Sequence, residues 1–168
     1  MSTQRPTPDP IRRGQQSVWS YPRPARLERN ERHIVVVFDG RVVAETSAGF
    51  RVIETSHPPT YYLPPDDIDL GMVRRVPGRG SFCEWKGYAT YFDVVTESQD
   101  QRRACWTYLD PSPSFVPMTG HVAFYAAMMA ECRVDGEVAK PQQGAFYGGW
   151  ITSHVAGPFK GPPGTEYW

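Results

Sequence analysis

Four adjacent residues, Cys83, Glu84, Trp85 and Lys86, bring a potential nucleophile, a carboxylate, an indole and one of only three lysines into one short segment. A thiol reacts as its thiolate, which a nearby cation stabilises, and a lysine in a pocket can instead bind an anion. In an extended strand Cys83 and Trp85 share one face and Glu84 and Lys86 the other, so Cys83 and Lys86 meet only if the segment turns. The structural alternative is a turn in which Lys86 pairs with Glu84 or another carboxylate.

His57 is a second candidate, because two prolines follow it and hold its backbone in extended geometry. A histidine fixed in this way could serve as an acid or a base. Its neighbour Ser56 points away from it on a strand, so the two do not form a nucleophile–base pair directly. The alternative is a loop histidine without a chemical role. If the protein is an enzyme, Cys83, Lys86 and His57 are its candidate catalytic residues.

Three aspartates, Asp66, Asp67 and Asp69, could hold a divalent cation through oxygen ligands, as a metal-assisted nucleotidyl transfer would require. Two of them also suit a helix start after two prolines, where carboxylates face unpaired backbone N–H groups. The three cysteines are an odd number at wide spacings without a Cys-x-x-Cys pair, which fits neither a disulfide framework nor a cysteine-based zinc site. The sequence predicts no metal site and no cofactor.

The elements that must position these residues are predicted to be short strands. Residues 33–38 and 41–46 are rich in β-branched side chains and flank Asp39-Gly40, the signal of a type I′ hairpin, and Asp135-Gly136 marks another hairpin. Further strands are predicted at residues 50–54, 61–63, 72–76, 88–95, 104–109 and 150–155, with one short helix at residues 64–68. Residues 122–134 predict a strand pair or a bent strand, in which 126–132 is strand despite its helix propensity.

The C-terminal residues 144–168 are rich in glycine, proline and aromatic residues and predict an irregular segment that wraps the sheet. Residues 157–165 do not match the phosphate-loop pattern Gly-x-x-x-x-Gly-Lys-Ser/Thr, and their three prolines carry no N–H donor for a phosphate. We expect Phe159, Tyr167 and Trp168 to cover the sheet and Lys160 to be exposed.

Composition limits the class of protein. The 168 residues fit one domain, and equal numbers of basic and acidic residues, 18 each, indicate neither a nucleic-acid partner nor a membrane partner. Without a membrane-span-length apolar run or a signal-peptide core, we expect a soluble, cytoplasmic protein. Residues 1–17 are expected to form a flexible basic tail. Residues 18–168 are expected to form a single domain that includes an ordered N-terminal arm and the wrapping segment.

Several segments then carry a resemblance: Tyr-Tyr-Leu-Pro-Pro-Asp-Asp at 61–67, Cys-Glu-Trp-Lys-Gly-Tyr-Ala-Thr-Tyr at 83–91, Trp-Thr-Tyr at 106–108 with Pro111, and His-Val-Ala-Phe-Tyr at 121–125. In this order and spacing they resemble the DUF427 family, which is sometimes catalogued under a nucleotidyltransferase-like name. Residues 146–152 and 157–165 resemble the ending of a longer branch of that family. The resemblance covers roughly residues 18–168.

Strands joined by short turns predict a mainly β fold, a β-rich α+β domain with one or two short helices. The resemblance adds a β-tent, two antiparallel sheets that meet at an angle, as in Mss4-like proteins, the cereblon drug-binding domain and methionine sulfoxide reductase B. Those relatives commonly hold structural zinc with paired cysteines, which this chain lacks, so we carry over the fold without structural zinc. In such relatives aromatic side chains line a shallow pocket for a flat or imide-like ring. The pocket predicted for this chain consists of Tyr62, Trp85, Lys86 and Trp106, with His57 at its edge.

Two functions from different classes follow. The first is a binding module for a small planar or anionic molecule or a modified residue, because aromatic residues are abundant and no complete catalytic triad is recognisable. The alternative is an enzyme, with either Cys83-centred thiol redox or transfer chemistry or a metal-assisted nucleotidyl transfer. A third, structural interpretation treats the basic arm and the aromatic C-terminal segment as surfaces for a homodimer or another partner.

Overall fold

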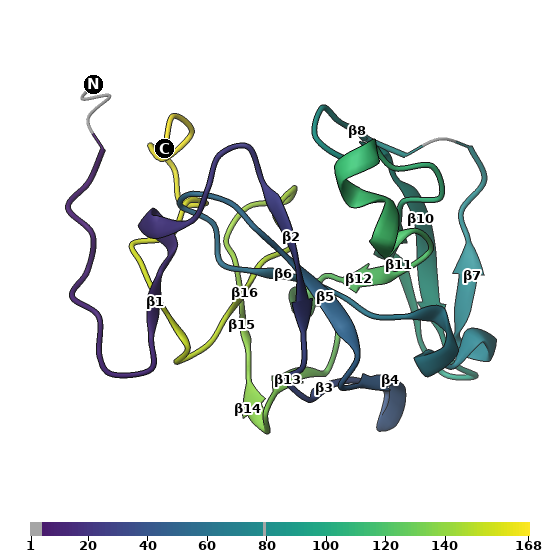
Figure 1. The fold of residues 1–168 in the computed structure, drawn as a ribbon. Coiled ribbons are helices and arrows are strands. Elements are labelled where there is room, and N and C mark those ends of the chain that lie inside the picture. Colours follow the sequence, from purple (N-terminus) through teal and green to yellow (C-terminus); the bar gives the residue numbers. More distant parts are fainter. Residues whose placement is uncertain (1–4, 79) are drawn as a thin grey trace.

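A computed structural model describes residues 5–78 and 80–168 of the chain. Residues 1–4 of the predicted tail lie outside the described residues. The mainly β prediction is confirmed, because short strands form several mostly antiparallel sheets and the helices are short (Figure 1). Within the described ranges, no helix combines the length and the hydropathy that crossing a bilayer requires.

The strands are β1 Gln16–Ser17, β2 Arg26–Asn30, β3 Ile34–Phe38, β4 Arg41–Thr46, β5 Gly49–Ile53, β6 Thr60–Tyr62, β7 Val73–Arg75, β8 Phe82–Cys83, β9 Gly87–Tyr88, β10 Thr90–Val95, β11 Asp100–Thr107, β12 Val122–Phe124, β13 Glu131–Val134, β14 Glu137–Val138, β15 Lys140–Pro141, β16 Trp150–Ile151 and β17 Val155–Ala156. The helices are short 3-10 turns: η1 Val18–Ser20, η2 Pro65–Asp67, η3 Leu70–Met72, η4 Pro113–Met118 and η5 Ala126–Met128.

Two four-stranded antiparallel sheets form most of the fold, with the orders β12-β11-β10-β7 and β14-β13-β3-β4. A three-stranded sheet, β2-β5-β6, lies above β3 and β4 and to the left of β10 and β11 in Figure 1. A bridge between Leu63 and Val122 connects the ends of β6 and β12. The pairs β8-β9 and β15-β16 are antiparallel, whereas β1 and β17 pair in parallel. The chain therefore places residues of the β6 region beside β11 and β12, where the candidate site lies.

Both hairpins expected from Asp-Gly pairs are present. Asp39 and Gly40 have φ values of 51° and 70°, and Asp135 and Gly136 have φ values of 49° and 81°. Positive φ at both central residues defines a type I′ turn, whose twist matches the twist of the flanking strands. The first turn connects β3 to β4 and the second connects β13 to β14.

The strand prediction for residues 126–132 is wrong over its first half. Ala126–Met128 form η5, in which the Met128 and Met129 N–H groups donate to the Tyr125 and Ala126 carbonyls. The chain then re-enters a strand at Glu131. The turn is needed because β12 pairs with β11 whereas β13 pairs with β3, so the backbone must leave one sheet before it joins the other. Helix-favouring Ala and Met residues suit this short turn.

Strand β2 falls in the stretch that the sequence analysis describes only as an ordered arm. All five of its residues pair with β5, from Arg26 opposite Ile53 to Asn30 opposite Gly49. Its side chains are mostly polar, so the hydrophobic alternation that would reveal a strand is weak. The partner strand therefore decides the structure of this segment.

The core consists of three groups of buried side chains. The largest lies between the two four-stranded sheets and includes Val36, Phe124 and Trp150. The second is rich in aromatic rings and includes Tyr62, Trp106 and Tyr108. The third joins η1 to the C-terminal segment through Val18, Trp19, Tyr21, Ile53 and Val155. The aromatic second group forms the floor of the candidate site.

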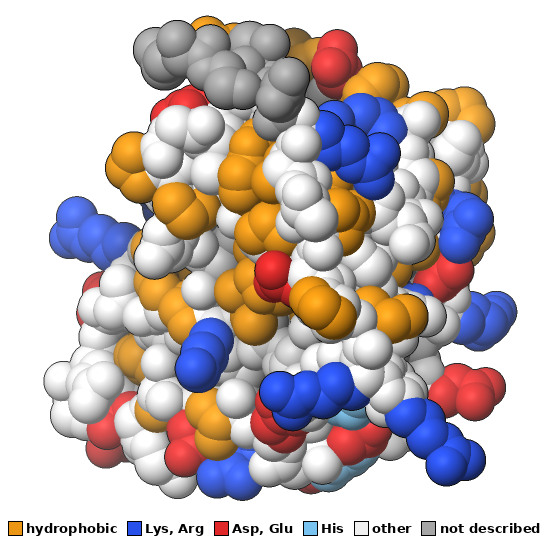
Figure 2. Space-filling model, turned by 90° about the vertical axis from the view of Figure 1, so that its left-hand side faces the viewer, with side chains coloured by type: hydrophobic (Ala, Val, Ile, Leu, Met, Phe, Trp, Pro, Cys, Tyr) orange, Lys and Arg blue, Asp and Glu red, His pale blue; other side chains and the backbone are white. Residues whose placement is uncertain are grey.

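The N-terminal arm lies beside the C-terminal segment, on the side of the molecule away from β7, β10 and β11 (Figure 1). The Asp9 N–H donates to the Gly157 carbonyl at 2.8 Å, the Gln16 N–H donates to the His154 carbonyl at 2.9 Å, and Arg5 donates to the Trp19 carbonyl at 2.7 Å. On this face hydrophobic side chains are interspersed with charged side chains of both signs (Figure 2). The arm is therefore held by backbone hydrogen bonds and by the hydrogen bond from the Arg5 side chain.

Candidate functional site: an aromatic cleft with two lysines

The structure encloses a cleft of about 430 Å³ between the β8–β9 hairpin, strands β6 and β11, and the segment after β15. The residues that the sequence analysis assigns to a site all line this cleft: His57, Tyr62, Cys83, Trp85, Lys86 and Trp106. Its tyrosine, tryptophan and phenylalanine side chains are Tyr62, Phe82, Trp85, Tyr91, Trp106, Tyr108, Tyr125, Phe146 and Tyr147. The fold thus brings together candidates from separate segments of the chain.

Trp106 is the centre of the aromatic wall. Its ring centroid lies 4.4 Å from that of Tyr125 and 6.4 Å from that of Tyr62, and the Tyr62 ring is almost perpendicular to it. The indole Nε1–H donates to the Tyr62 hydroxyl at 3.4 Å. Burial raises the pKa of Tyr62, so its hydroxyl is neutral and keeps a proton to donate. A Cβ at Gly148 would stand only 2.2 Å from Cη2 of Trp106, so only glycine lets this loop lie against the ring.

The β8–β9 hairpin supplies the turn that would let Cys83 and Lys86 approach each other. The Lys86 N–H donates to the Cys83 carbonyl at 3.2 Å, and Gly87 then adopts a φ of 103° that favours glycine. The Lys86 ammonium lies 5.8 Å from the centroid of Tyr108. Among the described residues it has no ion pair or hydrogen bond, so the expected alternative of a Lys86–Glu84 pair is not formed.

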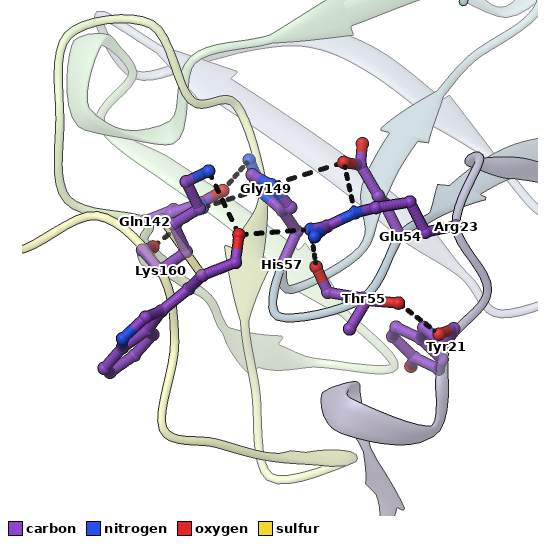
Figure 3. A network of polar contacts seen from close by, with 9 residues as sticks. Tyr21, Arg23, Glu54, Thr55, His57, Gln142, Gly149 and Lys160 are labelled. Carbon is purple, nitrogen blue, oxygen red and sulfur yellow. Dashed lines mark hydrogen bonds and ion pairs between the residues drawn. The ribbon is translucent and has the colours of Figure 1, made fainter. Parts of the chain in front are cut away.

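His57 lies in a polar network at one end of the cleft (Figure 3). The Gln142 side chain fixes its tautomer, because the Gln142 oxygen accepts from the Gly149 N–H at 3.2 Å and its amide nitrogen donates to the Lys160 carbonyl at 2.9 Å. The same amide nitrogen lies 3.0 Å from Nδ1 of His57. Nδ1 must therefore accept, and the ring proton resides on Nε2.

The electrostatic surroundings keep His57 neutral. Burial, together with the positive charges of Lys160, Arg23 and Lys86, lowers its pKa to about 4. This result changes the role expected for His57: at neutral pH the ring is a hydrogen-bond donor at Nε2 and an acceptor at Nδ1. The nearest carboxylate to Nε2 is that of Glu54, at 3.8 Å.

Lys160 is half-buried and lines the cleft, so the expectation that it is exposed is wrong. Its N–H donates to the Ser56 carbonyl at 2.9 Å, and the Ser56 N–H donates to the Val18 carbonyl at 3.0 Å. These bonds place the wrapping segment directly beside His57. Burial and the nearby Arg23 guanidinium lower the pKa of Lys160, and its ammonium donates to the Trp168 main-chain oxygen at 3.3 Å.

A second, more polar cavity of about 520 Å³ lies between the N-terminal arm and β2. Its charged side chains are largely paired: Glu28 pairs with Arg51 at 2.8 Å, and Arg32 pairs with Asp135 at 2.9 Å. Charged side chains that already pair with one another are less available to bind a charged ligand than an unpaired lysine is. The aromatic cleft is therefore the better candidate.

Two of the three aspartates considered as metal ligands, Asp67 and Asp69, make structural contacts. Asp67 accepts a hydrogen bond from the buried Thr46 hydroxyl at 2.6 Å, and Asp69 caps η3 by accepting from the Gly71 N–H at 3.0 Å. Asp69 also lies 3.7 Å from the Arg41 guanidinium. The described ranges contain no group of three or more His, Cys, Asp or Glu side chains that could hold a metal ion.

We expect one of the three cysteines to react in the native protein. Cys105 and Cys132 are buried, and burial raises the pKa of both thiols, that of Cys132 to about 12, whereas Cys83 is half-buried in the cleft. Titration with a chromogenic disulfide reagent should therefore label one thiol per chain rapidly and all three in denaturant. Cys83→Ser should abolish the rapid labelling, and a second rapid thiol in that variant would contradict this assignment.

Several residues of the cleft were missed from the sequence, among them Glu54, Gln142 and Tyr147. The Tyr147 ring lies edge-on against His57 at 5.3 Å. Gln142 is far from His57 along the chain, and no local pattern links a glutamine to a histidine at that separation. The glycine pair at 148 and 149 was a local indication that this segment packs closely against other residues of the cleft, because only glycine allows the backbone to approach so closely.

The family profile described as a domain of unknown function, DUF427, matches residues 26–136, which is more than half of the chain. The chain belongs to the DUF427 family. No curated protein matches it. The DUF427 match contains His57, Tyr62, Cys83, Lys86 and Trp106, whereas the part of the cleft formed after residue 136 lies outside it. The β-tent assignment, the division at residue 17 and ligand binding stay predictions.

Proposed function

We propose that this DUF427 protein is a binding module for a small, flat, anionic molecule, which its aromatic cleft holds. The observation that carries the proposal is the Lys86 ammonium, which lines an aromatic-walled cleft and has no ion pair among the described residues. Partly removing a cation from water without a nearby negative charge costs free energy of desolvation. The charge of an anionic ligand would offset that cost. The aromatic walls would pack against a flat ring.

The potential inside the cleft supports the same ligand class. Lys160, Arg23 and Lys86 all lower the pKa of His57, so the cleft has positive charge from both of its lysines and from Arg23 nearby. The volume of about 430 Å³ falls within the range of small-molecule sites. Its polar side chains include a hydrogen-bonded group around His57 at one end, which would orient a ligand against the aromatic walls.

One observation favours the alternative, thiol chemistry at Cys83. Of the three cysteines, Cys83 alone lines the cleft, and it shares its hairpin with Lys86. A metal-assisted nucleotidyl transfer has less support, because Asp67 and Asp69 are engaged in the contacts described above. Mass spectrometry of a bound compound after incubation separates the two functions, since a binding module returns it unchanged.

A thermal-shift screen of flat anionic compounds tests the binding proposal. A ligand at 100 times its Kd adds about 2.7 kcal/mol to the free energy of unfolding, which raises Tm by about 5 to 10 °C for a chain of this size. Lys86→Ala should remove the shift. Lys140→Ala, which changes an exposed lysine outside the cleft, should retain it. A hit that survives Lys86→Ala unchanged would refute the role of this lysine, and an empty screen would count against the function.

A further inference from the structure

One end of the cleft holds a hydrogen-bond donor and an acceptor that do not satisfy each other. Nε2 of His57, which carries the ring proton, lies 3.8 Å from Oε2 of Glu54, beyond hydrogen-bond distance. Both side chains line the cleft and are mostly buried, with 18% of His57 and 23% of Glu54 exposed. Leaving a partly buried donor or acceptor without a hydrogen bond costs free energy. A ligand that forms hydrogen bonds to both side chains would remove this cost.

Arg23 does not satisfy the Glu54 carboxylate. Its Nε lies 3.6 Å from the same oxygen, and its terminal nitrogen is committed to the Thr55 carbonyl at 2.9 Å and the Trp168 main-chain oxygen at 3.3 Å. Figure 3 shows His57 and Arg23 directed at Glu54 from different sides. Glu54 therefore has a long ion-pair contact with Arg23 and faces the neutral His57 ring, but accepts no hydrogen bond from any described residue.

This end of the cleft does not suit a simple anion. A carboxylate or phosphate brought to Nε2 of His57 would meet the Glu54 carboxylate within a few ångströms, and like charges at that distance repel. A group that accepts from His57 and donates to Glu54 avoids the repulsion. A neutral C=O beside an N–H is such a group, because both functions sit on adjacent atoms.

We propose that the ligand is a flat cyclic amide with an anionic substituent: its ring C=O accepts from Nε2–H of His57, its ring N–H donates to Glu54, and its anionic group reaches Lys86. This inference rests on the proposed function and names the ligand class of the same cleft. The Gln142 amide is essential to the arrangement, because it keeps the ring proton of His57 on Nε2. A cyclic amide bound in this way makes two directional contacts that a plain aromatic acid cannot make.

The test compares two compounds of almost equal size and charge, 6-hydroxynicotinate, whose ring in water is mainly the oxo, N–H form, and nicotinate, which lacks the C=O and N–H. Isothermal titration calorimetry on the full chain should show 6-hydroxynicotinate binding about 10- to 100-fold more tightly. Lys86→Ala should lower the affinity for both compounds, because both carry the carboxylate.

Two variants address the donor and the acceptor separately. His57→Phe keeps a ring against Tyr147 but removes the donor, and Glu54→Met keeps the side-chain length but removes the acceptor. Each should bring the ratio of the two affinities close to one. Glu45→Met, an exposed glutamate that contacts His33 outside the cleft, should leave the ratio unchanged.

The outcomes separate this inference from the function on which it rests. Equal Lys86-dependent affinities for the two compounds would overturn the cyclic-amide inference and leave the binding proposal standing. Absence of binding by both compounds at millimolar concentration would overturn the inference as well. A preference for 6-hydroxynicotinate that persists in both His57→Phe and Glu54→Met would also overturn it. The comparison on the unmodified protein does not depend on the folding of any variant.

Discussion

Trp150→Ala is expected to lower the free energy of unfolding by about 3 to 5 kcal/mol, the range for removing a large aromatic side chain from a core. Trp150 is 1% exposed and packs against Tyr61 at a centroid distance of 5.3 Å. Its indole Nε1–H donates to the Phe124 carbonyl at 3.0 Å, so truncation also leaves a buried acceptor without its donor. Urea unfolding followed by circular dichroism measures the loss.

The main chain of Trp150 also contacts the segment next to the cleft. The Trp150 N–H donates to the Pro59 carbonyl at 2.9 Å, which ties β16 to the segment that begins at His57. Tyr167→Ala is a matched control, because Tyr167 is 75% exposed, and surface changes of this kind stay within about 0.5 kcal/mol. A loss below about 1 kcal/mol for Trp150→Ala would show that the core around it collapses to fill the space.

Stability should fall by about 3 kcal/mol through His57 alone when the pH drops from neutral to 4. The pKa of His57 is about 4 in the folded protein, chiefly because of burial, against 6.5 for an exposed histidine. Between these values the unfolded state binds more protons, so stability rises with pH. The contribution is full above pH 6.5 and is lost as the pH falls toward 4, and the gap between the two pKa values corresponds to about 3 kcal/mol.

A variant without the imidazole isolates this effect from the carboxylates that also titrate in acid. His57→Gln should show a shallower decline of unfolding free energy between pH 7 and pH 4 than the unmodified protein. His33→Gln, a change at a half-exposed histidine outside the cleft, is the matched control. Parallel declines for the unmodified protein and His57→Gln would mean that His57 titrates normally in the folded state.

Local backbone chemistry explains which elements were predictable. The Asp39-Gly40 and Asp135-Gly136 turns were correct because positive φ at two successive positions is a preference of those residues themselves. The short helix at Pro65–Asp67 was correct for a similar reason, since proline fixes φ at a helix start. The turn at residues 126–128 was missed because its structure depends on which sheet the next strand joins.

Some residues of the candidate site could be predicted from the sequence, and others could not. Tyr62, Trp85, Lys86 and Trp106 could be grouped from their residue types and from the family resemblance, and they do line one cleft. The role of His57 could not be predicted, because a donor at Nε2 requires Gln142 to hold Nδ1. That contact exists only after residues far apart along the chain pack together.

The β-rich class, the hairpin turns and the aromatic character of the site follow from residue types and from neighbours along the chain. Contacts between distant segments place β12 and β13 in different sheets, bring Lys160 into the cleft, and set Glu54 opposite a neutral His57. Long-range contacts depend on the packing of whole elements, which no local preference specifies. The aromatic residues of the cleft could therefore be predicted from the sequence, whereas the polar contacts at its end could not.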